Sequence, residues 1–192
     1  MKIQIIIGST RPGRVGDKIG QWVYSQLSKA QPEAEFELVD LLEFNLPLMN
    51  ETIPPLGLQG KYTSEVGQKW ADKIASADGY VIVTPEYNHS FPASLKNGLD
   101  YIGLQMAKKP VAFVSYSPLP SGGSRAVEQL IPVTVQFSTV TLNHPLNIAN
   151  TMQLIDQQTG EVKADMYVEP AQKMAAEIVW WTKNLKKIRD EQ

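Results

Sequence analysis

The chain has 192 residues, which is enough for one well-buried core and leaves little room for a second. Its formal net charge is −2, so the composition does not predict the basic face that nucleic-acid binding requires. The chain contains no cysteine, which excludes disulfides, thiolate metal sites and a cysteine nucleophile.

Targeting and metal-binding signals are also missing from the sequence. The apolar run at residues 3–7 is too short for a signal peptide, and no run approaches the ~18 residues of a membrane span. His89 and His144 lie far apart without a companion at metal-ligand spacing, so no metal site is expected. We therefore expect a cytoplasmic protein that folds as a single domain over residues 1–192 and does not associate with membranes.

Short apolar runs that are rich in β-branched residues and bounded by turn residues predict buried strands. They lie at residues 3–7, 36–39, 80–83 and 111–114. Their continuous apolarity is typical of strands covered on both faces. A fifth strand is predicted at 138–142, with 145–148 extending it after a break.

Apolar residues at helical spacing occupy the segments between these strands and a final segment near the C-terminus. The predicted helices cover residues 17–29, 62–76, 93–101, 124–136 and 170–188. This alternation predicts an α/β fold, a doubly wound five-stranded parallel sheet with helices on both faces. Ligands in such sheets bind beyond the carboxyl ends of the strands. We interpret the irregular stretches 44–61 and 150–168 as lids, oligomer contacts or mobile loops.

The loop after the first strand has the residue types of an anion site. From Gly8 to Gly16 it reads Gly-Ser-Thr-Arg-Pro-Gly-Arg-Val-Gly. Its glycines free backbone N–H groups, its arginines add charge, and a helix N-terminus follows. The spacing matches neither G-x-x-x-x-G-K-[ST] nor G-x-G-x-x-G. A phosphate site is one interpretation, and a solvated strand-to-helix loop is the other.

The loop after the third strand offers polar and aromatic groups between two prolines. Tyr87, Asn88 and Ser90 suit a flat heteroaromatic ring such as a flavin. The alternative is a turn in which Asn88 and Ser90 cap the next helix and Tyr87 covers a core edge. Glu86 is either an acid or base or a partly solvated carboxylate.

The loop after the fourth strand places two adjacent glycines before a helix. Gly122 and Gly123 permit close approach of the backbone to a ligand, or they serve only the turn. Ser117 lies in this loop, and we include it among the candidate cofactor-binding residues.

The three loops together resemble the NADPH-dependent FMN reductases, a family with a flavodoxin-like fold that includes quinone, azo-dye and chromate reductases. The resemblance covers about residues 1–145. It rests on Gly8, Ser9, Thr10, Arg11, Arg14 and Gly16, then residues 84–88 with Pro92, Leu95, Lys96 and Asn97, then Gly122, Gly123 and Arg125. One departure is the Ser-Pro-Leu-Pro run at 117–120, where the family usually has a glycine.

The resemblance implies two sets of cofactor contacts. The residues implied around the FMN phosphate are Ser9, Arg11, Arg14, Val15 and Gly16. Those implied along the isoalloxazine ring are Pro85, Glu86, Tyr87, Asn88 and Ser90, with Gly122 and Gly123 near its other side.

We therefore predict an oxidoreductase in which bound FMN takes electrons from NADPH and passes them to a small-molecule acceptor. The acceptor is a quinone, an azo compound, a metal oxyanion or free flavin. Because the cofactor performs the chemistry, no catalytic side chain is expected. The resemblance also implies a homodimer or homotetramer.

Two alternatives remain from the sequence. One is a flavodoxin-like electron carrier that binds FMN without NAD(P)H activity of its own. The other is a nucleotide-binding domain without flavin, in which Asp40 holds a ribose.

Overall fold

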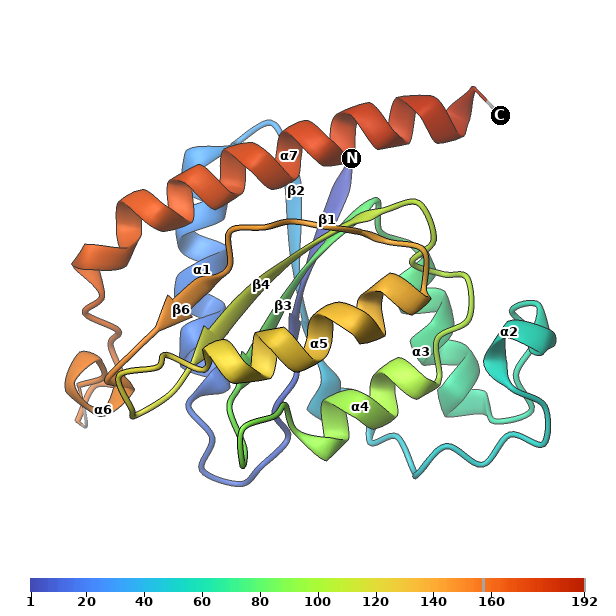
Figure 1. Ribbon diagram of the computed structural model, residues 1–192, viewed down its shortest axis with the longest axis horizontal. Helices are drawn as coiled ribbons and strands as arrows, with labels where there is room; N and C mark the ends of the chain where they lie inside the picture. Colours follow the sequence, from blue (N-terminus) through green and yellow to red (C-terminus); the bar gives the residue numbers. More distant parts are fainter. Residues whose placement is uncertain (157, 192) are drawn as a thin grey trace.

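A parallel sheet lies between two layers of helices (Figure 1). The computed structural model describes residues 1–156 and 158–191. The strands are β1 (Lys2–Ile7), β2 (Glu35–Asp40), β3 (Gly79–Pro85), β4 (Pro110–Tyr116), β5 (Val140–Thr141) and β6 (Leu146–Ile148). Their order is β2-β1-β3-β4-β5, with β6 also paired with β4. This is the flavodoxin-like order, so the predicted fold class is confirmed.

The fifth position in the sheet is shared by two short strands. β5 pairs with the start of β4, where Pro110 lies opposite Val140, and β6 pairs with its end, where Val114 lies opposite Leu146. Between these two pairs the offset grows by two residues, so the intervening segment bulges away from the ladder. The predicted break before the second half of this strand is therefore confirmed.

Alternate residues of each strand pack against different helical layers, as the two-residue period of a strand requires. Ile3 and Ile5 of β1 lie in one core cluster, and Ile6 lies in the other. Tyr80 and Ile82 likewise face the second cluster. Both faces of the sheet are thus covered, which explains why the strands are continuously apolar.

The helices divide between the two faces of the sheet (Figure 1). The long helices are α1 (Gly16–Ala30), α3 (Glu65–Ala75), α4 (Ala93–Asp100), α5 (Ser124–Gln136) and α7 (Val168–Asp190). α1 and α7 cover the first cluster, and α3, α4 and α5 cover the second. The helix expected to begin at residue 62 begins instead at Glu65, because the Ser64 hydroxyl accepts a hydrogen bond from the Gly67 N–H and caps it.

The stretches expected to be irregular contain short helical turns. These are α2 (Pro55–Leu58), α6 (Thr151–Leu154) and η2 (Asp165–Tyr167), and a further turn, η1 (Leu41–Phe44), ends where the first stretch begins. Ile155 and Val162 form an antiparallel bridge, and Gln157 between them lies outside the described residues. Within the described part of the chain, no helix has both the length and the apolarity that crossing a membrane requires.

Candidate functional site

The loops that follow β1, β3 and β4 meet at the carboxyl edge of the sheet. The Tyr87 hydroxyl lies 3.1 Å from the Ser9 hydroxyl and accepts a hydrogen bond from Arg11 Nε at 3.2 Å. The Glu86 N–H donates to the Tyr116 carbonyl oxygen, which joins the second loop to the end of β4. Three segments far apart in the sequence therefore form one site.

A cavity of about 140 Å³ lies among these loops. Its lining residues are Ser9, Arg11, Arg14, Val15, Pro85, Glu86, Tyr87, Tyr116, Pro118, Thr151 and Met152. Sites for small molecules usually measure about 300–1,000 Å³, so this cavity has room for only part of such a ligand.

A tight turn presents Tyr87 to the cavity. Tyr87 and Ser90 exchange two backbone hydrogen bonds, and Asn88 and His89 between them have φ angles of 50° and 64°. Two consecutive residues with positive φ form the type I′ turn of a short hairpin, which favours asparagine. Asn88 and Ser90 thus shape the turn and do not line the cavity, and Pro92 precedes α4 without a side-chain cap.

Arg14 joins the first loop to the end of β2. Its guanidinium forms an ion pair with the Asp40 carboxylate, and its Nη1 also donates to the Ser9 carbonyl oxygen. Asp40 in turn accepts a hydrogen bond from the Leu42 N–H. Arg11 forms no ion pair with any described residue, so its charge is the less compensated of the two at the cavity.

Glu86 has one satisfied and one unsatisfied carboxylate oxygen. Its side chain is 5% exposed, and Arg125 Nε and Nη2 both contact Oε1, at 2.7 and 2.6 Å. Oε2 is buried and has no hydrogen-bond partner. Among the described residues, the only other such side-chain atom is Gln4 Oε1. Glu86 is one of the residues that line the cavity, so this buried acceptor without a donor belongs to the candidate site.

Tyr116 ends β4 with its hydroxyl against the start of α1. A Cβ atom added to Gly16 would collide with this hydroxyl, so the close packing of α1 on β4 requires glycine there. Burial raises the pKa of the Tyr116 phenol, and the neighbouring Tyr87 raises it further. Tyr116 therefore stays neutral in the physiological pH range.

The glycine pair in the third loop approaches other protein atoms closely. Gly122 and Gly123 have φ angles of 59° and 86°, and Cβ atoms at these positions would meet Asn147 and Ser115 at 2.8 and 2.9 Å. Neither glycine lines the cavity. Ser117 is also absent from the lining, and its hydroxyl accepts a hydrogen bond from the Leu119 N–H.

The cavity therefore brings together just over half of the residues predicted from the sequence. Those that line it are Ser9, Arg11, Arg14, Val15, Pro85, Glu86 and Tyr87. Those that support it from outside are Gly16, Asn88, Ser90, Ser117, Gly122 and Gly123. Contact of any of these residues with a cofactor remains a prediction.

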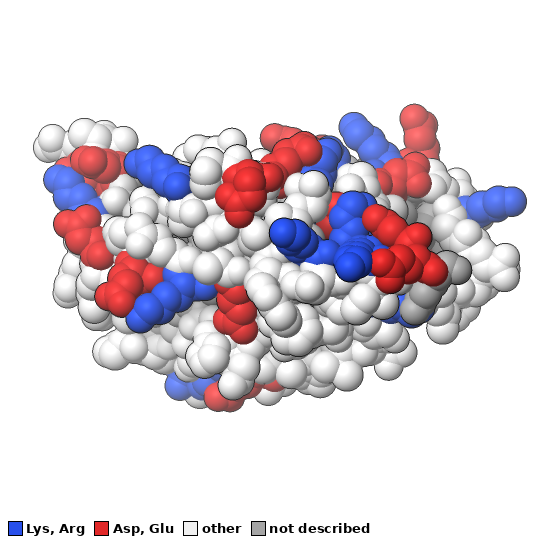
Figure 2. Space-filling model, turned by 90° about the horizontal axis from the view of Figure 1, so that it is seen from above, with Lys and Arg blue, Asp and Glu red and all other residues white. Residues whose placement is uncertain are grey.

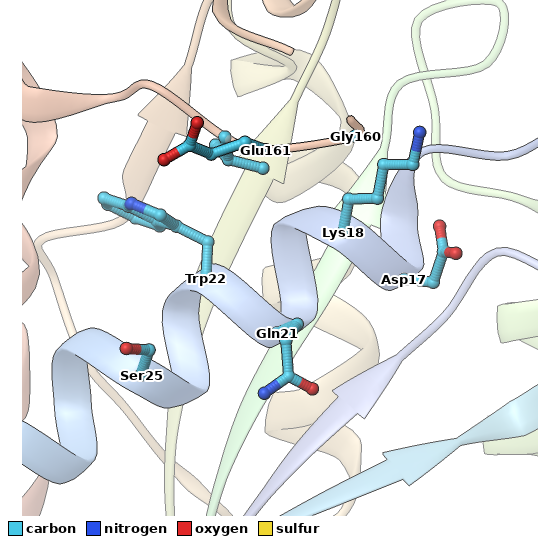
Figure 3. A pocket seen from close by; sticks show the side chains of 8 residues that line it. Asp17, Lys18, Gln21, Trp22, Ser25, Gly160 and Glu161 are labelled. Carbon is cyan, nitrogen blue, oxygen red and sulfur yellow. The ribbon is translucent and has the colours of Figure 1, made fainter. Parts of the chain in front are cut away.

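A second, wider hollow of about 660 Å³ lies on the outer side of α1 (Figure 3). Asp17, Lys18, Gln21 and Trp22 line it from the helix, and Glu161 lines it from the facing segment. None of the predicted site residues takes part in it.

Comparison with known families decides the assignment. Residues 1–153 match the family model described as NADPH-dependent FMN reductase. The chain belongs to this family. The family predicted from the three loops is thereby confirmed, and it is one of oxidoreductases that use FMN and NADPH.

Individual members of the FMN reductase family show the same relationship. The chain is 37% identical to the NAD(P)H-dependent FMN reductase ntnL of Nectria sp, over 67% of this chain and 65% of that one. It is 39% identical to a quinone reductase of Escherichia coli (strain K12), over 48% of this chain and 52% of that one. The match thus spans less than two thirds of the length of each of these relatives.

Solved structures of flavoenzymes share the fold. The flavoenzyme NAD(P)H:(acceptor) oxidoreductase FerB from Paracoccus denitrificans superposes with a TM-score of 0.74, covering 95% of this chain and 97% of that one. The sequence identity is 22%, so this likeness shows the fold alone.

Four residues of the cavity were missed as site candidates in the sequence. They are Tyr116, Pro118, Thr151 and Met152. Tyr116 and Pro118 stand beside predicted residues of the third loop, and their place after a predicted strand was the available signal. Thr151 and Met152 open α6 within a polar stretch, where no periodicity or motif marks them. They reach the site because the Thr151 N–H donates to the Ser117 carbonyl oxygen.

Proposed function

We propose that the protein is an NAD(P)H-dependent oxidoreductase that holds FMN at the carboxyl edge of its sheet and reduces a small-molecule acceptor, with quinones the first class to test. The proposal rests on the cavity, in a member of the FMN reductase family, whose lining includes Arg11, Glu86 and Tyr87. A quinone is favoured because the matching relative from Escherichia coli is named a quinone reductase.

The groups at the cavity fit the chemistry of FMN. Arg11 is a guanidinium without a carboxylate partner among the described residues, and it lies in a loop that leads into the N-terminus of α1. Both features favour a phosphate. Glu86 Oε2 is a buried acceptor without a donor, and the flavin ring carries an N–H group. In this proposal Arg11 binds the phosphate, and Glu86 accepts a hydrogen bond from the N–H group of the ring.

The chemistry that FMN supplies when bound is two-electron transfer from a nicotinamide to an acceptor. The side chains do the positioning. Ser9, Arg11 and Arg14 would hold the phosphate, and Pro85 and Tyr87 would hold the ring. The apolar side chains of Pro118 and Met152, which also line the cavity, would limit the access of water.

The flavin-free nucleotide-binding alternative is weakened by the geometry of Asp40. Its carboxylate already receives hydrogen bonds from Arg14 and from the Leu42 N–H. A carboxylate engaged in this way is poorly placed to accept the two hydroxyls of a ribose.

Assembly into a homo-oligomer is part of the proposal. Leu56 and Leu104 are 59% and 62% exposed, and both line a groove between α2 and α3. Light scattering of the purified protein measures its mass in solution. A monomer at all concentrations would contradict this part of the proposal.

The first experiment is to titrate the purified protein with FMN and to follow NADPH oxidation with and without 1,4-benzoquinone. We expect flavin binding and turnover that depends on both FMN and the quinone. Binding without turnover would favour the electron-carrier alternative, and no binding would refute the proposal.

Substitution of Arg11 tests the phosphate end. We expect Arg11→Ala to weaken FMN binding about tenfold, which corresponds to roughly 1.4 kcal/mol, and to leave riboflavin binding unchanged because riboflavin has no phosphate. Lys29→Ala, at the other end of α1, is the matched control for loss of one positive charge. Equal losses in Arg11→Ala and Lys29→Ala would contradict a specific contact.

A further inference from the structure

The Arg14–Asp40 ion pair is built into the wall of the site, yet only one of its partners lines the cavity. The side chains of Arg14 and Asp40 are 11% and 19% exposed. Arg14 Nη1 donates to Asp40 Oδ1 at 2.9 Å, and its Nη2 forms a second, shorter contact with Oδ2. This two-point geometry fixes the plane of the guanidinium, which a single contact would leave free to rotate.

The pair closes the first loop on itself. Arg14 Nη1 also donates to the Ser9 carbonyl oxygen at 2.5 Å, and the Arg14 N–H donates to the Arg11 carbonyl oxygen at 3.1 Å. The loop between Ser9 and Arg14 is therefore tied at its start, middle and end. Arg14 is the residue common to all three ties.

The sheet places Asp40 where it can hold this tie. Asp40 is the last residue of β2 and lies opposite Ile7, the last residue of β1. Its Oδ1 also accepts a hydrogen bond from the Leu42 N–H at 3.0 Å, which holds the carboxylate against its own backbone. The position of the Asp40 carboxylate, which holds the loop through Arg14, is thus set by the strand register and not by the loop itself.

We propose that Asp40 is a positioning residue for phosphate recognition: through Arg14 it holds the Ser9–Arg14 loop in the form that binds the phosphate of the flavin. This inference rests on the proposed function. Asp40 does not line the cavity, so in this proposal it acts on the phosphate only through Arg14.

The negative charge of Asp40 supports a different role, which would change FMN affinity in the opposite direction. A carboxylate beside an anion site repels the anion and neutralises part of the charge of Arg14. If neutralisation were its main effect, removing Asp40 would strengthen FMN binding. If positioning is its main effect, removing it weakens FMN binding, so the direction of the change separates the two roles.

The test compares FMN with riboflavin, which differ by the phosphate. Dissociation constants for both are measured by fluorescence titration of the full-length protein with Asp40, Asp40→Ala, Arg14→Ala and the double substitution. We expect Asp40→Ala to weaken FMN binding at least tenfold and riboflavin binding less than twofold. We expect the double variant to bind FMN no more weakly than Arg14→Ala, because Asp40 acts through Arg14.

Two further variants serve as a conservative substitution at Asp40 and as a control for the loss of one carboxylate. Asp40→Asn keeps an acceptor oxygen for the Leu42 N–H and for Arg14 Nη1 but removes the charge and the acceptor for Arg14 Nη2. We expect it to lose FMN affinity selectively, by less than Asp40→Ala, and it tests the proposal where Asp40→Ala folds poorly. Glu35→Gln removes a carboxylate that pairs with Lys2 at the other end of β2, and we expect it to leave both affinities unchanged.

The outcomes distinguish the two proposals. Equal loss of FMN and riboflavin affinity, tighter FMN binding, or a further loss on adding Asp40→Ala to Arg14→Ala would each overturn the role of Asp40. If the unsubstituted protein binds neither flavin, the proposed function itself fails.

Discussion

At the amino edge of the sheet, Asp78 receives hydrogen bonds from the Lys2 N–H at 3.0 Å, from Lys186 at 3.1 Å and from Arg189 at 3.3 Å. At the carboxyl edge, Arg125 contacts only one oxygen of Glu86, and the other oxygen has no partner. Both edges use an acid beside basic residues. At the amino edge protein donors satisfy the carboxylate, whereas at the carboxyl edge one carboxylate oxygen has no hydrogen-bond partner.

The tyrosines at the two edges also differ in whether their hydroxyl groups bond within the core or at the cavity. The Tyr80 hydroxyl donates to the Ile74 carbonyl oxygen at 2.7 Å and accepts from Lys109 at 3.2 Å, within the core. The Tyr87 hydroxyl instead bridges Ser9 and Arg11 at the cavity. Substitutions at the amino edge should therefore change stability alone, whereas those at the carboxyl edge should also change ligand binding.

On the face seen in Figure 2, the described residues form no patch of a single charge that could compete as a binding site. Acidic and basic side chains are interspersed there, over the face where α7 lies. This agrees with the net charge of −2 and with ion pairs such as that between Lys173 and Glu169.

The largest effect is expected from Arg125→Ala, which leaves the Glu86 carboxylate buried without any partner. Breaking a buried pair from one side typically costs about 3–5 kcal/mol. Because Arg125 is 37% exposed and water can partly replace it, we expect a loss of about 2–3 kcal/mol in the free energy of unfolding. Urea denaturation at pH 7 measures it.

The matched variant is the pair Glu86→Gln with Arg125→Met, which removes both charges. It should recover most of the lost stability, because no isolated charge remains buried. A double variant as unstable as Arg125→Ala would show that the ion pair is not the cause. We also expect Glu86→Gln alone to change flavin affinity, since it alters the carboxylate whose Oε2 has no hydrogen-bond partner.

A smaller loss, about 2 kcal/mol, is expected from Gly16→Ala. The backbone at Gly16 is helical, so alanine suits it, but the added methyl group collides with the buried Tyr116 hydroxyl. Thermal unfolding of Gly16→Ala and of Gly16→Ala with Tyr116→Phe separates the two effects. If the double variant is not more stable than Gly16→Ala, the collision is not the reason for glycine here.

The sequence carried enough information for the order of elements and for the edge that holds the site. Strand apolarity and helical spacing report burial, and a parallel sheet brings the loops after its strands together. The ion pairs of Arg14 with Asp40 and of Arg125 with Glu86 could not be predicted in this way. The two residues of these pairs are 26 and 39 residues apart in the sequence, and no local pattern predicts which loops are in contact.

The glycine pair shows a different limit of sequence interpretation. Gly122 and Gly123 indicate that something approaches the backbone closely, but the pattern does not say what. In the structure the close neighbours are Asn147 and Ser115. A positive φ and a short contact are needed equally for packing a loop and for admitting a ligand.

At the amino edge, Asp78→Asn should lower stability by about 1 kcal/mol at pH 7 and leave flavin affinity unchanged. Burial raises the pKa of Asp78, but hydrogen bonds from the Lys2 N–H and Lys186 and the charges of Lys186 and Arg189 outweigh it, so the net pKa is lowered. The stabilisation is present above the ordinary pKa of about 3.8 and is lost as the pH falls through the lowered value. Urea denaturation from pH 7 to pH 3 should show the two proteins converging in acid. A change in flavin affinity would break the division between the edges.

The last expected effect is a dependence of stability on pH, and it lies at Lys109, in the same amino-edge network. Burial lowers its pKa to about 8, and the charge of Arg189 adds to this. Between about pH 8 and 10 the unfolded chain keeps this proton and the folded chain releases it, so stability rises with pH in that window. Lys109→Met should abolish the rise, whereas Lys29→Met should preserve it.

Above about pH 10 the raised pKa of Tyr80 acts in the opposite direction, because the folded protein then retains a proton that the unfolded chain loses. Tyr80 is present in both variants, so the difference between wild type and Lys109→Met isolates the lysine. A wild-type curve parallel to that of Lys109→Met from pH 8 to 10 would mean that Lys109 titrates as it does in water and that the amino edge is more open to solvent than its hydrogen bonds indicate.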